Sequence, residues 1–341
     1  MKPTIYDVAR EAGVSIATVS KVINRTGKIS EKTRERVAAV MEGMGYAPNL
    51  VATALSSKKT FMIGLLLPDI SNPYFAELAR NIEDRAHELS YNIVICNTDN
   101  HVDKEREYLT FLQQKGVDGI LLATGLAHPE SLGLVTDRQL PITVIAREVP
   151  RTPVNTVLVD DFMGGFLATS HLLELGHREI AIIVESMDLE SSRQRLKGYR
   201  AALEEHNCAF HAERVAVSDF TVASGMEIAG GILDAPDRPT AVFACNDLLA
   251  IGTIQAARSR GIPVPGELSV VGFDNTFLCG IIDPALTTVG QPIRELGRQA
   301  VDLLHKQMSG EEPARQRVVL LPELVVRAST QPPLERTSAV K

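Results

Sequence analysis

Carboxylate, amide and guanidinium side chains stand at or just after the ends of several short apolar runs of this 341-residue chain. The residues in these positions are Asp69, Asn72, Arg147, Asn246, Asp247, Asp274 and Gln291. Tyr74 and Phe75 add flat apolar faces beside the first of them. Such groups suit a small polyhydroxylated ligand, because each hydroxyl donates and accepts hydrogen bonds and an aromatic ring can cover the apolar face of a sugar.

The elements that must position these side chains are short apolar runs alternating with amphipathic helices, the pattern of a parallel sheet covered on both faces. The first series predicts strands at Phe61 to Leu67, Tyr91 to Cys96, Gly119 to Ala123 and Ile142 to Ala146, with helices at Asn72 to Ser90 and Lys104 to Lys115. In open α/β sheets ligands bind at the carboxyl ends of the strands, where these side chains lie.

A second, similar series begins after Val157 to Asp160. It predicts strands at Glu179 to Val184, Glu213 to Val217, Thr240 to Ala244 and Leu268 to Gly272, and helices at Phe162 to Leu175, Arg195 to His206, Ser224 to Leu233 and Asp247 to Arg260. Two series indicate two lobes facing each other across a cleft. The helix Ile293 to Met308 and the following VVLLPELVVRAS should complete both lobes, and Thr330 to Lys341 should be a disordered tail.

The segment Thr4 to Asn24 predicts two short helices around a tight turn. Thr4 with Asp7 is a capping-box pattern, Gly13 suits the left-handed residue that ends a helix, and Ser15 is a preferred N-cap for the second helix. Two helices joined in this way form a helix-turn-helix unit. The outward side chains of the second helix suit a DNA major groove, although a helical hairpin that packs on another element is the alternative. These outward residues are Ile16, Ala17, Thr18, Ser20, Lys21 and Asn24.

Charge is spread unevenly along the chain. Residues 1–60 carry ten Lys and Arg against five Asp and Glu, a net charge of +5, whereas the remainder has a net charge of −12. Ser30 should cap a third helix, EKTRERVAAVMEGMG, in this basic part. A basic end on an acidic body is expected of a protein that contacts phosphate at one end only.

Several function classes are disfavoured by the sequence. Cys96, Cys208, Cys245 and Cys279 form no CxxC pair, which argues against a zinc site or disulfide framework, and three of them are expected to be buried thiols. No nucleophile–base pair, metal cluster or paired carboxylates indicate an enzyme, and no cofactor or metal is expected. No apolar run approaches membrane-spanning length, so a cytoplasmic protein is expected.

The sequence resembles the lactose/galactose-repressor family of bacterial transcription regulators. The resemblance is carried by YDVAREAGVS, TVSKVIN, ISEKTRERV and GYAPN in the N-terminal part, and by PDISNPYFAELARNIEDRA, RPTAVFACNDLLAIG and VPGELSVVGFDNT in the body. It implies an all-α helix-turn-helix headpiece (1–47), a hinge helix and linker (48–60), a two-lobed α/β core like that of periplasmic sugar-binding proteins (61–329) and the tail (330–341).

The resemblance also implies roles for individual residues. DNA contacts are implied for Thr4, Tyr6, Ser15, Thr18, Ser20, Asn24, Ser30, Thr33, Tyr46, Asn49 and Ala52, with Ile16, Ala17 and Lys21 at the specificity positions and Leu55 as a minor-groove wedge. Lys21 stands where Arg is common in the family. Effector contacts are implied for Arg195, Asn246, Asp274 and Gln291 first, and then for Asp69, Asn72, Tyr74, Phe75, Arg147, Asp161 and Phe220.

The family mechanism implies a homodimer on a roughly palindromic operator, with a small sugar-like effector acting as inducer or co-repressor. Some of these residues have a structural role as the alternative to ligand contact. Asn246, Asp247 and Asp161 could serve as helix caps and no more, and Arg195 could pair with Glu190 or Asp188 at the surface. Gly164 and Gly165 favour close helix packing over a phosphate site. A binding protein without DNA function, an α/β enzyme, and regulation by a partner protein stay as competing hypotheses.

Overall fold

The computed structural model describes residues 3–23, 27–46, 59–124, 140–146, 154–311 and 315–334. The predicted site residues Asn24, Asn49, Ala52, Leu55 and Arg147 lie outside the described residues, and so does nearly all of the predicted hinge segment.

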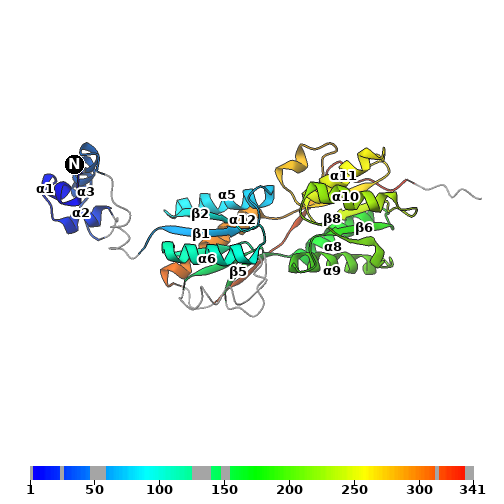
Figure 1. Ribbon diagram of the computed structural model, residues 1–341, viewed down its shortest axis with the longest axis horizontal. Coiled ribbons are helices and arrows are strands. Elements are labelled where there is room, and N and C mark those ends of the chain that lie inside the picture. The colour runs from blue at the N-terminus through cyan, green and yellow to red at the C-terminus, as the bar shows by residue number, and fades with distance from the viewer. Residues whose placement is uncertain are drawn as a thin grey trace, which may run out of the picture.

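Three helices form the N-terminal headpiece, drawn in blue in Figure 1: α1 (Ile5–Glu11), α2 (Ile16–Ile23) and α3 (Glu31–Gly43). Val8, Val19 and Val37, one from each helix, are fully buried in its core. Gly13 has a φ of +61°, in the left-handed region, so a residue with a side chain would be strained at this turn. The predicted helix-turn-helix unit is therefore present.

The first lobe contains a six-stranded sheet in the order β11-β5-β4-β3-β1-β2. Its strands are β1 (Met62–Leu67), β2 (Asn92–Asn97), β3 (Gly119–Leu122), β4 (Ile142–Ile145), β5 (Asn155–Val159) and β11 (Arg317–Leu320). Helices α5 (Pro73–Glu88) and α12 (Ile293–Ser309) pack on one face and α6 (Val102–Lys115) on the other. All pairings within this sheet are parallel.

The second lobe repeats this plan with a sheet in the order β12-β10-β9-β8-β6-β7. Its strands are β6 (Ile180–Val184), β7 (Val215–Val217), β8 (Ala241–Ala244), β9 (Ser269–Asp274), β10 (Thr287–Gly290) and β12 (Glu323–Val325). Helices α8 (Asp161–Glu174) and α9 (Glu190–Glu205) cover one face, and α10 (Val222–Asp234) and α11 (Asp247–Ser259) cover the other. Only β12 runs antiparallel to its neighbour, among the described strands.

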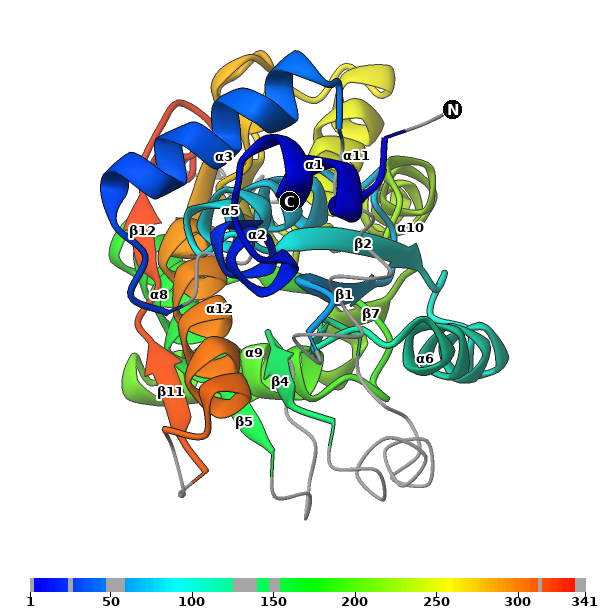
Figure 2. The same ribbon diagram turned by 90° about the vertical axis from the view of Figure 1, so that its left-hand side faces the viewer.

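Within the described part of the chain, three connections join the lobes. The chain passes between them from β5 to α8, from β10 to α12, and from β11 to β12. Figure 2 draws the last of these in red, with β11 and β12 labelled on it, and these two strands belong to different sheets. The prediction that the C-terminal segment completes both lobes is therefore confirmed.

The structure corrects a few local predictions. Helix α9 begins at Glu190, so Arg195 lies in its second turn and does not open it. Residues 212–214 form a short 3-10 helix, η1 (Ala212–Arg214), and only Val215–Val217 is a strand. A second 3-10 helix, η2 (Phe277–Gly280), follows β9.

The prediction of a disordered tail from Thr330 onward is wrong for its first residues. The Thr330 hydroxyl lies 3.0 Å from Nε2 of His171, and the Gln331 backbone N–H donates to the Ser269 hydroxyl at 3.0 Å. The buried ring of His177 contacts the Gln331 carbonyl at 2.9 Å. These hydrogen bonds attach the segment to the second lobe, beyond the boundary predicted at residue 329.

Candidate functional site

Helix α2 presents the side chains that the sequence assigns to DNA. Ile16, Ala17 and Lys21 are exposed, whereas Val19 and Val22 are buried against the other two helices. The Ser15 hydroxyl accepts the Thr18 backbone N–H at 3.1 Å, which fixes the start of this helix as predicted. Apolar and cationic groups thus lie on the outer face of a short, capped helix.

The neighbouring caps place further predicted residues on the headpiece surface. The Asp7 carboxylate accepts the backbone N–H of Thr4 at 3.0 Å and its hydroxyl at 2.7 Å. Ser30 caps α3 by accepting the Thr33 N–H at 3.3 Å. The Tyr6 side chain is 68% exposed. The remaining predicted residues described in the headpiece, Thr18, Ser20, Thr33 and Tyr46, are partly exposed.

A narrow cavity of about 40 Å³, here called the central cavity, lies where the two lobes meet. Residues from both lobes line it: Asn72, Tyr74, Phe75, Ala146, Glu185, Ser191, Arg195, Phe220, Asn246, Asp274 and Gln291. Eight of the eleven residues predicted from the sequence for an effector are among them. The carboxyl ends of the strands in the two sheets converge here, as the topology of open α/β sheets requires.

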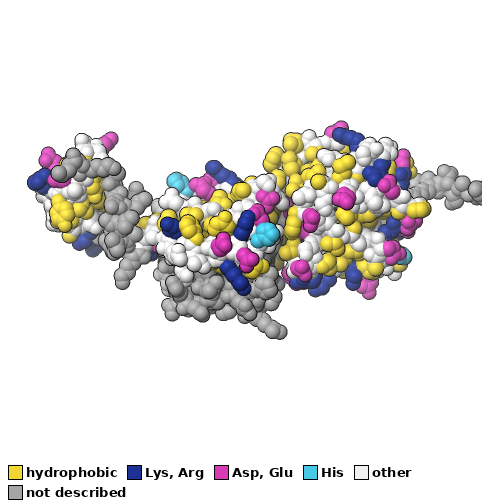
Figure 3. Space-filling view, viewed as in Figure 1, with side chains coloured by type: hydrophobic (Ala, Val, Ile, Leu, Met, Phe, Trp, Pro, Cys, Tyr) yellow, Lys and Arg dark blue, Asp and Glu magenta, His cyan; other side chains and the backbone are white. Residues whose placement is uncertain are grey.

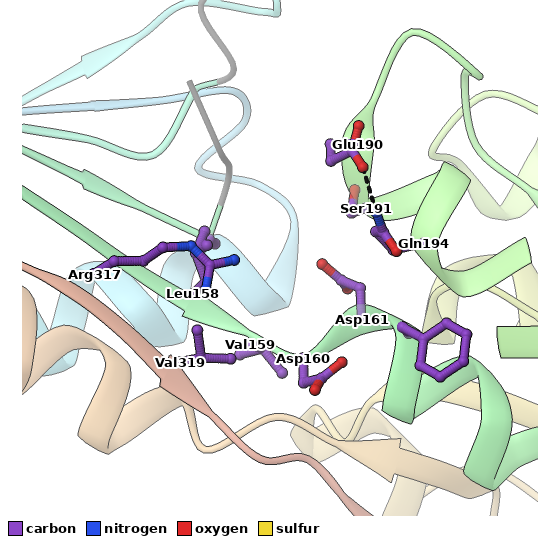
Figure 4. A pocket seen from close by; sticks show the side chains of 11 residues that line it. Leu158, Val159, Asp160, Asp161, Glu190, Ser191, Gln194, Arg317 and Val319 are labelled. Carbon is purple, nitrogen blue, oxygen red and sulfur yellow. Dashed lines mark hydrogen bonds between the residues drawn. The ribbon is translucent and has the colours of Figure 1, made fainter. Parts of the chain in front are cut away.

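Two larger hollows adjoin the central cavity. One, of about 230 Å³, contains Asp161, Glu190, Gln194 and Arg317, and shares Ser191 and Ala146 with the central cavity. Figure 4 shows Arg317 reaching toward it from the first lobe, with Asp161 and Glu190 facing it from the second. The other, of about 440 Å³, contains Asp69, Asp99 and Asp219 and shares Asn72, Phe75 and Phe220. Asp69 and Asp161 therefore lie beside the central cavity and not in it.

Arg195 is held rigidly at the wall of the central cavity. Its Nε and Nη2 donate to one oxygen of Asp161, each at 2.8 Å, and its Nη1 donates to the Cys245 carbonyl. The guanidinium carbon lies 3.7 Å from the centre of the Phe273 ring. Burial alone lowers the pKa of Arg195, but the charges of Asp161, Glu185 and Asp274 outweigh burial and raise it. The guanidinium is thus a fixed cation.

Asp274 and Gln291 form a second fixed group. The Gln291 amide donates to Oδ1 of Asp274 at 2.7 Å, and its oxygen accepts from the Tyr74 hydroxyl of the first lobe at 3.2 Å. Asp274 has a φ of +118°, a conformation rarely adopted by residues other than Gly, and such strain occurs often at binding sites. Burial, and then the charge of Asp247, raises the pKa of Asp274 well above its ordinary value.

Asp247 lies behind the cavity and neither caps α11 nor lines the cavity. Its carboxylate accepts the backbone N–H of Thr276 at 2.7 Å, the Thr276 hydroxyl at 2.9 Å and the Thr288 hydroxyl at 2.7 Å. Asn246 is the N-cap, because its Oδ1 accepts the Leu249 N–H at 2.7 Å, and it also lines the cavity. Asp247 therefore ties α11 to the segment that follows Asp274.

Two more alternatives raised by the sequence are wrong. Asp160, not Asp161, caps α8, with its carboxylate accepting the Met163 N–H at 2.9 Å. Glu190 pairs with Arg193 at 2.6 Å and not with Arg195, whose side chain is only 7% exposed. Asp161 and Arg195 instead pair with each other across 34 residues of sequence.

Close contact between α8 and α9 sets the position of Arg195. A Cβ on Gly165 would lie 2.2 Å from the Arg195 carbonyl oxygen, and a Cβ on Gly198 would lie 2.1 Å from the Phe162 oxygen. The two helices therefore touch backbone to backbone, as the glycines of this region predicted. Three of the four cysteines, Cys96, Cys245 and Cys279, are buried, also as predicted.

Sequence reasoning missed three residues of the central cavity: Glu185, Ser191 and Ala146. Glu185 comes directly after β6 and is only 6% exposed, so the rule applied to the other strand ends would have found it. Ala146 carries no chemical signal, although its φ of +57° marks the end of β4. Ser191 becomes visible only once α9 is known to begin at Glu190.

Comparison with known proteins agrees with both parts of this architecture. Residues 4–49 match the model of the lacI family of bacterial regulatory proteins, and residues 169–330 match a periplasmic binding protein-like domain. The chain is 48% identical to the HTH-type transcriptional regulator DegA of Bacillus subtilis over 335 residues, which cover 97% of this chain and 99% of that protein. The chain belongs to the lacI family.

Solved structures of other transcriptional regulators have the same fold as this lacI-family chain. The lac repressor dimer bound to operator and the anti-inducer ONPF matches with a TM-score of 0.86 and 30% identity, over 97% of this chain and 100% of that one. The complex of the transcriptional regulator CelR with cellobiose matches with a TM-score of 0.74 and 30% identity, over 96% and 99%. The family consists of transcriptional regulators, so the predictions of a DNA-binding regulator and of a non-enzymatic function are confirmed.

No helix within the described ranges is long and apolar enough to cross a membrane.

Proposed function

We propose that this regulator is a ligand-responsive repressor that binds a roughly palindromic operator as a homodimer in the cytoplasm, with a sugar or sugar derivative in its central cavity. One observation carries the proposal. A single chain combines a helix-turn-helix headpiece, in a segment of net charge +5, with an interlobe cavity lined by polar and aromatic side chains. The first part suits phosphate and base edges, and the second suits a small hydroxylated molecule.

The outer face of α2 supports recognition in the major groove. Exposed Ile16 and Ala17 can contact thymine methyl groups but cannot form a bidentate hydrogen bond to a base. Lys21, which is also exposed, is the one basic residue of α2. It can bring a positive charge to guanine or phosphate. We therefore expect an operator half-site in which thymine methyls contribute to specificity.

An exposed apolar surface on the second lobe supports self-association. Phe277 in η2 is 66% exposed and Ile281, directly after it, is 70% exposed. Figure 3 shows hydrophobic side chains gathered on the right-hand lobe beside its junction with the other lobe, where Figure 1 draws the gold segment that holds η2. The matched lac repressor structure is a dimer. We propose that this surface contributes to a homodimer interface.

Sedimentation analysis tests this interface. Phe277→Asp should shift the protein toward the monomer, because a charged group would be buried at a packed surface. The matched control is Leu334→Asp, which changes an apolar side chain that is 61% exposed at another place. A Phe277→Asp protein that stays as dimeric as the wild type would remove this surface from the interface.

The central cavity supports coupling between ligand and DNA. Its walls belong to both lobes, and the Tyr74–Gln291 hydrogen bond crosses between them. A ligand that contacts both walls has different affinities for different lobe arrangements, and that difference in affinity is the condition for an allosteric effect. The hinge segment 48–60, which would carry this effect to the headpiece, stays a prediction.

A thermal-shift screen with monosaccharides, sugar phosphates, sugar acids and purines tests the ligand part of the proposal. A ligand at 100 times its dissociation constant should add about 2.7 kcal/mol to the free energy of unfolding. The gain should disappear in Arg195→Ala and Asp274→Ala, and the ligand should change operator affinity. Stabilisation by none of these compounds would contradict a sugar-like effector and favour a regulatory protein partner.

A further inference from the structure

Glu185 is a buried carboxylate at the wall of the central cavity. It follows β6 directly and is 6% exposed. Its Oε1 accepts the side-chain N–H of Asn246 at 2.7 Å. The orientation of that amide is fixed, because the Asn246 oxygen already accepts the backbone N–H of Leu249. The geometry therefore holds Glu185 as a hydrogen-bond acceptor facing the cavity.

Negative charge dominates the wall around Glu185. Arg195 is the one Lys or Arg among the described residues that line the central cavity, and its guanidinium already pairs with Asp161. Glu185 and Asp274 are thus two further carboxyl groups without a cation of their own in that lining. Like charges that share a buried site repel each other, so the wall favours a positive charge brought by a ligand.

The protonation of Asp274 agrees with this excess of carboxyl groups. Burial and the charge of Asp247, followed by that of Glu185, raise the pKa of Asp274, while Arg195 and Gln291 oppose the rise. In the absence of a ligand, Asp274 consequently keeps its proton to a higher pH than an ordinary aspartate does. An ammonium group can take the place of that proton, because it supplies both positive charge and hydrogen-bond donors.

One of the two hollows beside the cavity has the same sign, whereas the other contains Arg317 beside Asp161 and Glu190. Asp69 and Asp99 of the first lobe and Asp219 of the second line the adjoining 440 Å³ hollow. Lys104 lowers the pKa of Asp99 through a hydrogen bond, so Asp99 is ionised, although its charge is paired. No Lys or Arg is among the residues that form this hollow in the described part of the chain. A cationic ligand is attracted along such a path, and a phosphate is repelled.

We propose that Glu185 determines the charge preference of the cavity: with Asp274 it selects an effector that carries a protonated amine among its hydroxyl groups and rejects phosphorylated or carboxylated analogues. This inference rests on the proposed function, because it describes the ligand of the same cavity. Arg195 and Asn72 remain for the hydroxyl groups, and Tyr74, Phe75 and Phe220 for the apolar face of the ligand. The amine is the feature that distinguishes this class from a neutral sugar.

Matched probes separate charge from shape. For glucose, galactose and mannose, the 2-amino sugar, the N-acetylated 2-amino sugar, the parent hexose and the 6-phosphate are compared by calorimetry on the full-length protein. At least one amino sugar should bind about 10- to 100-fold more tightly than its parent and its N-acetyl form, which is the range of a charge-assisted hydrogen bond. The 6-phosphates should bind most weakly.

Variants then test Glu185 itself. Glu185→Gln keeps the acceptor for Asn246 and the shape of the side chain, so it should fold normally and lose the amine preference by about tenfold or more. The control Glu267→Gln removes a carboxylate of the second lobe that pairs with Arg238 and lines neither the central cavity nor the two hollows beside it, and should keep the preference.

The inference is overturned if no amino sugar binds, if a parent hexose or phosphate binds more tightly than every amino sugar, or if Glu185→Gln keeps the wild-type preference. The proposed function fails by different results. It requires operator binding and a response to some small hydroxylated ligand, and tight binding of a neutral hexose would support it while overturning the amine preference.

Discussion

Gly165→Ala is expected to destabilise the second lobe, although alanine is the better helix former. The new Cβ would lie 2.2 Å from the Arg195 carbonyl oxygen and 2.8 Å from its carbonyl carbon. These are backbone atoms, so no side chain can rotate away, and α8 and α9 must separate by more than about 1 Å to restore ordinary contact.

The two opposing effects give the size of the change. Overpacking in a core costs about 1–3 kcal/mol, and alanine in place of glycine returns about 1 kcal/mol of helix propensity. With the upper end of the first range, the net loss is about 2 kcal/mol. The shift in melting temperature is the free-energy loss divided by the unfolding entropy, which is about 2.1 cal/mol/K per residue, so a loss of about 3 °C is expected for a 341-residue chain that unfolds as one unit.

Calorimetry and denaturant unfolding measure this loss, and ligand titration measures its consequence. Because Arg195 itself provides the contact, its guanidinium should move with α9 and ligand affinity should fall. Gly231→Ala is the matched control: it lies in α10, nothing lies within 4 Å of its new Cβ, and a gain of about 0.5–1 kcal/mol is expected. A Gly165→Ala protein as stable as Gly231→Ala would refute the backbone contact.

Three other predictions follow from single residues. Burial raises the pKa of Asp274, so the folded state keeps a proton that the unfolded state releases above about pH 4. The free energy of unfolding should therefore fall as the pH rises from about 4 through the raised pKa of the folded state. Asp274→Asn should flatten this fall in the melting temperature and be more stable than the wild type at pH 8; a steeper fall in the variant would contradict the burial effect. Asp247→Ala should cost about 3 kcal/mol or more, since it leaves three buried donors without their acceptor, whereas Glu83→Ala, at an exposed carboxylate, should change stability by less than about 0.5 kcal/mol. Lys21→Ala should reduce the slope of log affinity for DNA against log salt by about 1, and an unchanged slope would remove Lys21 from the phosphate contacts.

Strand ends were the part of the site that the sequence predicted well. An apolar run followed at once by a polar residue is visible without any tertiary information, and the parallel topology brings such ends together. This reasoning found Asn246, Asp274 and Gln291 on three neighbouring strand ends of the second lobe. It would also have found Glu185, had the strand before it been treated in the same way.

Pairs formed by tertiary packing were not predictable. Arg195 and Asp161 are 34 residues apart, and their contact depends on the glycine-mediated approach of α8 and α9. By spacing alone Arg195 had nearer partners at the surface. Asp247 likewise resembled a helix cap, and only its burial against Thr276 and Thr288 shows its structural role. In both cases burial against residues distant in the sequence, and not the local sequence pattern, determines the role of the side chain.

The most direct test of the proposed function is selection of DNA sites from a random library by the full-length protein, at moderate salt. The proposal predicts enrichment of a sequence with approximate two-fold symmetry, with half-site centres about 10 bp or a multiple of it apart. Ile16→Asp, which places a carboxylate on the exposed face of α2, should abolish that enrichment without unfolding the headpiece. Enrichment of no symmetric site by the wild type, or the same site enriched by Ile16→Asp, would contradict operator recognition by a dimer through α2.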